Sequence, residues 1–406
     1  MAGFELLLLL LLPLAAASGW FVARRRERYG EGGRTLSADY LRGLNHLVNE
    51  DADKAIEVFV KLLEVDNETA EVHLALGNLF RRQGEVDRAL RIHQNLVARP
   101  NLKTQHRNQA CYELAQDYLR AGVLDRAESL FTGLAEQGIF QERALAGLIS
   151  IYEQGRDWHQ AIDTTRKLES VVGHSLRPVI AHYLCELAEV ERRRRNTAKA
   201  QDYLKQALAE HRDCVRASLQ QGAALETAGD HVQAIEAYQR VTRQDLNFAG
   251  EILEPLERCH AARQDLDGWR HFLESLIERF DGIAPSIAMA RLLVREGHEP
   301  AAIEYLSAAL KRHPNWLGFH TLLGLVYPQP QAEPTGTLEG LKASLKRMIE
   351  VSARYRCGNC GFDGRNLHWQ CPRCKHWSTL APLPDLVMST PEPLPRLSSA
   401  LKPAKT

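Results

Sequence analysis

The sequence has no excess of charge of either sign, because 51 lysines and arginines are balanced by 51 aspartates and glutamates. Proteins that bind nucleic acid usually carry a basic face or stripe, so this balance gives no reason to expect a nucleic-acid partner. The composition, 45% hydrophobic and 25% charged, is typical of a globular protein. A chain of 406 residues is long enough for two or more domains.

The motifs of the common enzyme classes are also absent. The sequence contains no Gly-rich phosphate loop, no Gly-x-Ser-x-Gly and no His-Glu-x-x-His. Isolated acids and histidines on helices are too common to nominate as catalytic groups. The sequence therefore predicts a protein that is not an enzyme.

Cysteine is sparse outside one C-terminal segment. Half of the eight cysteines lie singly within predicted helices: Cys111, Cys185, Cys214 and Cys259. This spacing is not that of a secreted disulfide framework, so we interpret these four as small core residues.

The other four cysteines form two Cys-x-x-Cys pairs with ten residues between them: Cys357, Cys360, Cys371 and Cys374. Each pair can turn two thiolates toward one point, and four thiolates make a tetrahedral metal site. A site filled by four sulfurs leaves no position for a catalytic water, which favours a structural or electron-transfer role. Sulfur coordination suits zinc or iron, and the spacing does not choose between them. Two disulfides or a redox Cys-x-x-Cys are the alternatives.

Aromatic residues and histidines surround the second pair. A knuckle this small has little other core, so we expect Trp369 and Trp377 to cover the metal site. His368 and His376 flank the same pair. We interpret them as surface residues or supports for the ligands, and as spare ligands at most.

A long uncharged and apolar run lies at the N-terminus. Residues 6–23 contain no charged side chain, and as a helix they would span about 27 Å, close to the thickness of a bilayer hydrocarbon core. Four arginines follow within residues 24–28. We predict a transmembrane anchor over 1–23 and a basic linker over 24–35, with the N-terminus outside and the rest of the chain in the cytoplasm. A cleaved signal peptide is the alternative, but it would place its positive charge before the apolar run.

A helical repeat occupies residues 36–351. Small residues recur at intervals of 34, 38, 34, 39, 34, 34 and 34: Ala55, Ala89, Ala127, Ala161, Ala200, Ala234, Gly268 and Ala302. A period of 34 is that of the tetratricopeptide repeat, a pair of helices. One pair cannot bury its apolar face alone, so we expect about eight to nine units to stack into an all-α superhelix.

Two further positions keep the same register. A second small residue precedes the first by twelve positions in several units: Gly43, Gly77, Ala115, Ala188, Gly222 and Ala290. A larger apolar residue follows it by four positions in most units: Phe59, Phe131, Leu204, Tyr238, Phe272 and Leu306. We expect the small residues where the two helices of a repeat cross, and the larger ones between repeats.

The end of the array departs from the repeat. Gly324, 34 residues after Ala290, begins a ninth unit that is interrupted by three prolines and resumes at 338–351. We predict that this capping unit leads into a metal-binding domain at 352–380. Residues 381–406 are rich in Pro, Ser and Leu and are predicted to form a flexible tail.

The order of anchor, repeat array and four-cysteine knuckle resembles the lipopolysaccharide assembly protein B family of Gram-negative bacteria. The stretches that carry this resemblance are 11–20, 76–81, 84–89 and 355–379. The knuckle is similar to rubredoxin in its Cys-x-x-Cys-Gly and Cys-Pro-x-Cys pairs. It departs from rubredoxins in having only ten residues between the pairs, which argues against rubredoxin-like electron transfer.

The resemblance implies a regulator of lipopolysaccharide synthesis at the inner membrane. Members are thought to promote degradation of the lipid A deacetylase by a membrane AAA+ protease, and to gather other lipopolysaccharide synthesis or transport proteins. The resemblance also slightly favours iron over zinc as the bound metal, and it leaves open whether the protein self-associates. We therefore expect a non-enzymatic adaptor whose knuckle docks on the last repeats, with a redox or metal-sensing protein as the alternative.

Overall fold

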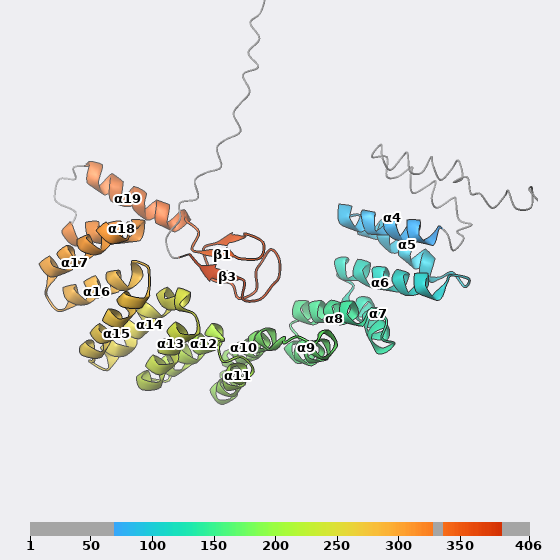
Figure 1. Cartoon of the computed structure of the whole chain (residues 1–406), viewed down its shortest axis with the longest axis horizontal. Coiled ribbons are helices and arrows are strands. Elements are labelled where there is room, and N and C mark those ends of the chain that lie inside the picture. The colour runs from blue at the N-terminus through green and yellow to red at the C-terminus, as the bar shows by residue number, and fades with distance from the viewer. Residues whose placement is uncertain (1–68, 328–335, 384–406) are drawn as a thin grey trace, which may run out of the picture. The chain divides into compact units, whose positions relative to one another are not determined.

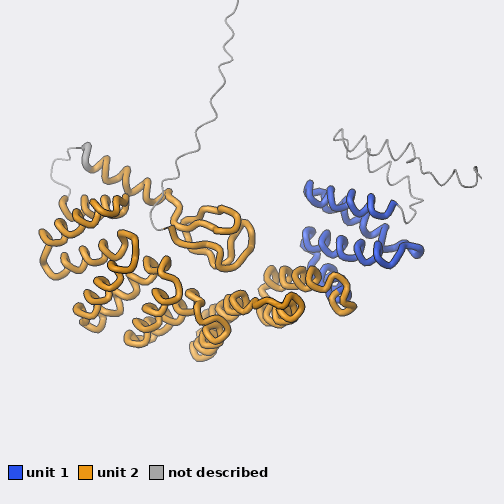
Figure 2. Tube along the Cα trace, in the orientation of Figure 1, with its two compact units in different colours: residues 1–134 blue, residues 135–406 orange. Residues whose placement is uncertain are grey.

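The computed structural model describes residues 69–327 and 336–383 (Figure 1). The chain divides into two compact units, residues 1–134 and residues 135–406 (Figure 2). The predicted membrane anchor, the basic linker, the first repeat and most of the predicted tail lie outside the described residues. No helix among the described residues is both long enough and apolar enough to cross a bilayer.

In unit 1 the described chain forms antiparallel helix pairs, as the period of 34 predicts. Its helices are α4 (Ala70–Gln83), α5 (Val86–Val97), α6 (Thr104–Arg120) and α7 (Leu124–Glu136), whose last two residues belong to unit 2. The interior of this unit contains a buried polar network, in which Arg81 donates to Asp117 at 2.8 Å. His93, fully buried, contacts the same carboxylate.

Unit 2 continues the helix pairs and ends in the knuckle. Its helices are α8 (Gln141–Gly155), α9 (Trp158–Val172), α10 (Arg177–Arg193), α11 (Thr197–Glu210), α12 (Val215–Thr227), α13 (His231–Gln244), η1 (Leu246–Phe248), α14 (Ala249–Ala262), α15 (Leu266–Arg279), α16 (Ala284–Arg295), α17 (Glu299–Arg312), α18 (Trp316–Val326) and α19 (Gly336–Val351). Helices α18 and α19 pack together as the capping unit, and α19 leads directly into the knuckle.

In several repeats the turn is built from a left-handed residue followed by a residue whose side chain caps the second helix. Positive φ values occur at Arg156 and Arg195 as well as at glycines such as Gly229. The next residue then caps the second helix: the Asp157 and Asp230 side chains accept the backbone N–H of the third residue beyond them. These caps satisfy N–H groups that the start of a helix leaves unpaired, and they fix where the helices that carry them begin.

The predicted packing register is confirmed where the structure describes it. Six of the anchor residues are buried: Ala89, Ala127, Ala161, Ala200, Ala234 and Ala302. The small residues twelve positions earlier lie where the paired helices touch. A β-carbon added at Gly77 would lie 2.4 Å from His93 Nε2, and one added at Gly222 would lie 2.5 Å from Tyr238 Cε1.

The knuckle is a three-stranded antiparallel sheet in the order β2-β1-β3. Its strands are β1 (Tyr355–Cys357), β2 (Asp363–Gly364) and β3 (Leu380–Pro382). The sheet lies inside the curve that the unit 2 helices form (Figure 1). It is the part of the fold that carries the candidate site.

Candidate metal centre

The two Cys-x-x-Cys pairs sit on two turns of the same construction. Cys357 ends β1, and the N–H of Gly361 donates to its carbonyl oxygen at 2.9 Å. In the second turn the N–H of Lys375 donates to the carbonyl oxygen of Cys371, also at 2.9 Å. Gly361 and Lys375 both have positive φ, 70° and 60°. Each turn therefore closes on the residue that follows its second cysteine, which brings the two sulfurs of the pair to one side.

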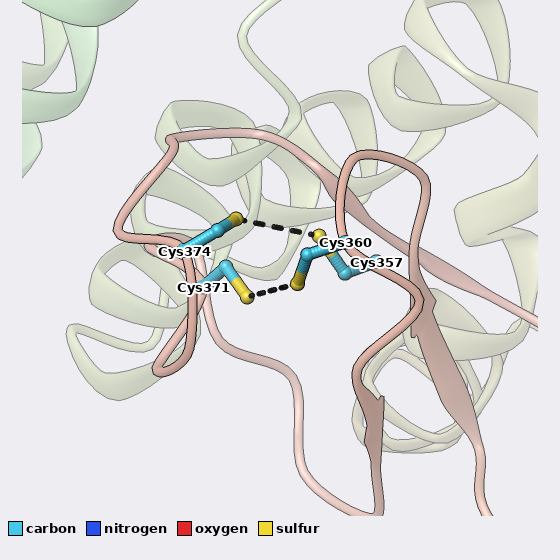
Figure 3. Close-up of side chains that lie close together, drawn as sticks. All are labelled: Cys357, Cys360, Cys371 and Cys374. Atoms are coloured by element: carbon cyan, nitrogen blue, oxygen red, sulfur yellow. Dashed lines mark hydrogen bonds between the residues drawn. The ribbon is translucent and has the colours of Figure 1, made fainter. Parts of the chain in front are cut away.

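The four cysteine sulfurs meet at one point (Figure 3). All four Sγ atoms lie within 4.8 Å of one another. Cys357 Sγ is 3.7 Å from Cys374 Sγ, and Cys360 Sγ is 3.7 Å from Cys371 Sγ. Four sulfurs bonded at about 2.3 Å to a central ion would be about 3.8 Å apart. The spacing thus fits one tetrahedrally bound metal, as predicted, and this donor set suits zinc or iron.

Hydrogen-bond donors around the sulfurs favour thiolates. The side chain of Asn359 and the backbone N–H of His376 lower the pKa of the Cys374 thiol to about 5. Burial raises the pKa of Cys357, but the Thr379 hydroxyl and nearby backbone N–H groups outweigh it, so the net shift is downward. Burial raises the pKa of Cys360 to about 12. Binding a metal would therefore displace a proton from that position.

The two tryptophans of the knuckle do not cover the site, and that expectation was wrong. The knuckle has its own small core of Tyr355, Leu380 and the cysteines, with Phe362 and Leu367 packed against it. Trp369 and Trp377 instead pack on the two helical clusters of unit 2. The sheet buries enough apolar surface by itself to release both indoles for contacts with the array. His368 and His376 are both exposed, and neither belongs to the four-sulfur cluster; His376 contacts the Cys374 carbonyl oxygen at 2.9 Å.

Glu153 on α8 joins the knuckle to the array. Its Oε1 accepts the indole N–H of Trp377 at 2.6 Å and the hydroxyl of Tyr183 at 2.7 Å. Its Oε2 accepts an amide N–H of Gln370 at 3.1 Å. Hydrogen bonds to a charged acceptor are stronger than those between neutral groups. One carboxylate therefore holds two residues of the knuckle against α8 and α10.

An aromatic cluster surrounds that carboxylate. The ring of His182 stacks on Trp377 with centroids 5.2 Å apart, and its Nε2 contacts the Ser378 hydroxyl. Trp158 meets Trp377 edge to face at 6.3 Å. His182 is 2% exposed, and burial lowers its pKa to about 3, with a contribution from the Arg216 guanidinium. The imidazole in this contact is therefore neutral at physiological pH.

The opposite side of the knuckle docks on η1 and α14. Trp369 stacks on Phe248 with centroids 5.6 Å apart. The Tyr355 hydroxyl donates to Glu251 at 2.5 Å, and burial together with that carboxylate raises the pKa of Tyr355. The knuckle thus docks on the middle repeats of unit 2, from α8 to α14, and the expectation that it docks on the last repeats was wrong. Helix α19 and the segment after it return the chain to the inner side of the curve.

Sequence reasoning missed the docking residues. Glu153, His182 and Glu251 lie singly on repeat helices, where an acid or a histidine is usually a solvated surface residue. Their partners are separated from them by as many as 224 residues. The two tryptophans in an otherwise small knuckle were the available signal, because they exceed what its core can bury.

Comparison with known proteins agrees with this architecture. Residues 355–382 match the model of the rubredoxin metal binding domain, and residues 40–101 and 185–245 match the tetratricopeptide repeat. A lipopolysaccharide assembly protein B from Escherichia coli K12 is 37% identical over 384 residues, 93% of this chain and 98% of that protein. The protein of the same name from Haemophilus influenzae is 34% identical over 390 residues, with the same coverage. The crystal structure of MamA, 19% identical, matches 45% of this chain and 96% of its own with a TM-score of 0.32.

Proposed function

Because the chain belongs to the lipopolysaccharide assembly protein B family, we propose that it is a non-enzymatic adaptor in lipopolysaccharide synthesis. Its relatives carry that name and match it over almost their whole length. The repeat array supplies a surface for partner proteins, since stacked repeats form extended binding faces. One metal ion, iron or zinc, held by Cys357, Cys360, Cys371 and Cys374, keeps the knuckle folded.

The finer proposal concerns partners and place. The N-terminal run at 6–23 anchors the chain in the inner membrane, with the array on the cytoplasmic side. The anchored array holds a lipid A deacetylase where a membrane AAA+ protease can degrade it. Confinement to one membrane raises the effective concentration of the two partners without any new contact between them.

The observation that carries the proposal is the attachment of the knuckle to the array. Glu153 bonds to both Gln370 and Trp377, and Glu251 bonds to Tyr355 on the other side. A four-sulfur site has no open position for substrate. A knuckle fixed in this way shapes a protein-binding surface, and its metal has a structural role.

The test compares the intact chain with Cys371→Ser in a pull-down from membranes, together with the half-life of the deacetylase. The matched control is Cys111→Ser, which changes a half-buried cysteine of α6 outside the knuckle. We expect the intact chain and the control to recover a protease and the deacetylase, and the knuckle variant to lose both and lengthen the half-life. Identical recovery and half-life in all three chains would refute the adaptor role of the knuckle.

A redox or metal-sensing protein is the second candidate, and the rubredoxin-type site favours it. Iron bound by four thiolates could exchange one electron with a partner. The visible spectrum of the purified protein separates the two candidates. Absorption that bleaches reversibly with a reductant would support the redox function, whereas a colourless zinc protein would exclude it.

A further inference from the structure

A groove of about 600 Å³ runs between the knuckle and helices α8, α10 and α12. We infer that this groove binds an acidic segment of a partner protein that also carries an aromatic or large apolar side chain. This inference rests on the proposed adaptor function, because it names the kind of segment that the adaptor holds. Four observations lead to it.

The first observation is the charge of the groove. Four cationic side chains line it: Arg156, Arg193, Arg216 and Lys375. The carboxylates among the lining residues are Glu153 and Glu186. Both are already engaged, Glu153 by the knuckle and Glu186 by Arg216 at 2.7 Å. Arg193 pairs with Glu189 at 2.9 Å, just as Arg216 pairs with Glu186, so Arg156 and Lys375 are the lining cations without an ion pair among the described residues. Through these two side chains the lining attracts anions, although the chain as a whole has no net charge.

The second observation is a buried guanidinium with unused donors. Arg216 is 6% exposed and makes two hydrogen bonds, one to Glu186 and a long one of 3.4 Å to the carbonyl oxygen of His182. Its Nε has no partner among the described residues. A guanidinium carries five N–H donors, and a buried donor without an acceptor costs about 1–3 kcal/mol. A bound carboxylate would offer acceptors to this group.

The third observation is the aromatic wall. Trp158, Trp369 and Trp377 all line the groove. The Arg216 guanidinium lies 5.9 Å from the centre of the Trp377 ring, so one side chain links the cationic and aromatic parts. Indole faces receive aromatic or apolar side chains as well as cations. The combination suits a peptide with mixed acidic and aromatic character better than a simple anion.

The fourth observation is that the groove is formed jointly by the repeat array and the knuckle docked on it. Arg156 directly follows the last residue of α8, whereas Lys375 lies in the second turn of the knuckle, one residue after Cys374. Neither side chain has an ion pair or hydrogen bond within the described chain, so both are available to a ligand. The groove is complete only when the knuckle is folded and docked, and recognition of the acidic segment is therefore dependent on the metal.

The test begins with a random dodecapeptide library displayed on phage and selected on the metal-loaded full chain. Enriched sequences are then synthesised and their affinities measured by fluorescence anisotropy. The test variant combines Arg156→Asp with Lys375→Asp. Both positions have positive φ, 55° and 60°, which aspartate tolerates better than most residues. The control is Arg212→Asp, whose side chain is 91% exposed outside the groove.

We expect enriched peptides to contain at least two acidic residues beside an aromatic one. The double variant should weaken their binding about tenfold or more, because it replaces attraction with like-charge repulsion. Arg212→Asp should change the affinity less than about twofold. Cys371→Ser should abolish binding. Neutral consensus peptides, no enrichment, or equal affinity for the double variant and the control would each overturn the inference.

A 12-nucleotide thymidine oligomer added as competitor separates a peptide site from a phosphate site. Displacement by the oligomer that depends on Arg156 and Lys375 would overturn the inference in favour of phosphate binding. The adaptor function is judged separately by the half-life of the deacetylase. If Cys371→Ser lengthens that half-life but no acidic peptide binds, the groove assignment fails and the adaptor function stands. If acidic peptides bind but Cys371→Ser leaves the half-life unchanged, the adaptor function fails instead.

Discussion

The indole N–H of Trp377 donates to the carboxylate of Glu153 at 2.6 Å across 224 residues of sequence. The same oxygen accepts the hydroxyl of Tyr183. This bond joins a turn of the metal knuckle to the third described helix pair, which begins with α8. On this side of the knuckle, one side chain of the array thus accepts hydrogen bonds from two knuckle residues, Gln370 and Trp377.

Replacing Glu153 by leucine should detach this side of the knuckle. The change removes the acceptor of Tyr183 and Trp377, and each buried donor left without a partner costs about 1–3 kcal/mol. We expect the docked state to lose about 2 kcal/mol or more, roughly a 30-fold change in the docked population. Hydrogen exchange of residues 355–382 measures this. Glu142→Gln, an exposed acid on the same helix, should leave exchange unchanged.

The same variant should bind its metal more weakly. Metal binding folds the knuckle and the folded knuckle docks, so the two equilibria are linked and each changes the other by the same factor. Competition with a chromophoric chelator measures the affinity of the intact chain and of Glu153→Leu. A metal affinity that stays the same while docking is lost would show that the knuckle folds independently of the array.

Acid should weaken docking through His182. Its pKa falls from the ordinary 6.5 to about 3 in the folded protein, so the folded state favours the neutral ring. This contribution to stability is complete above pH 6.5 and is lost progressively as the pH falls from 6.5 toward 3. His182→Phe keeps a ring against Trp377 but cannot titrate, so its urea midpoint should fall less over that range. His174→Asn replaces an exposed histidine, and its urea midpoint should fall as steeply as that of the intact chain.

Gly222→Ala should destabilise unit 2 by about 1–3 kcal/mol, because the new methyl group would collide with the Tyr238 ring. Gly133 is the matched control, since it also lies within a helix and an added β-carbon there has no neighbour within 4 Å. Gly133→Ala should stabilise the protein by up to about 1 kcal/mol. Thermal unfolding followed by circular dichroism distinguishes the two. Equal melting temperatures would contradict the packing described for α12 and α13.

Features that recur along the chain or depend on a few neighbouring residues could be predicted from the sequence. Contacts that occur once, between distant segments, could not. The period of 34 placed Ala89, Ala161 and Ala234 in the core, because each repeat solves the same packing problem with the same residue type. The spacing of Cys357 and Cys371 from their partners predicted one four-sulfur cluster, since two adjacent tight turns can meet in only a few ways. Local chemistry of this kind is encoded over a few residues and can be read without the fold.

The docking of the knuckle could not be read in this way. Whether Glu153 meets Trp377 depends on the accumulated rotation of several repeats and on the path of the chain through α19. Small differences in each helix crossing add up over that distance. Nothing close to Glu153 in the sequence distinguishes it from any other acid on a repeat helix, so both the docking surface and the groove beside it had to come from the structure.

The contact between Glu153 and Trp377 also sets the order in which the protein can fold during translation. At roughly 5–20 residues per second, the ribosome releases the α8 carboxylate about 10–45 s before the tryptophan that will bond to it. Throughout that interval the inner side of the array lacks its C-terminal cover. Completion of this face therefore waits for the end of translation and for capture of a metal ion, and a chain cut short before residue 371 would never reach it.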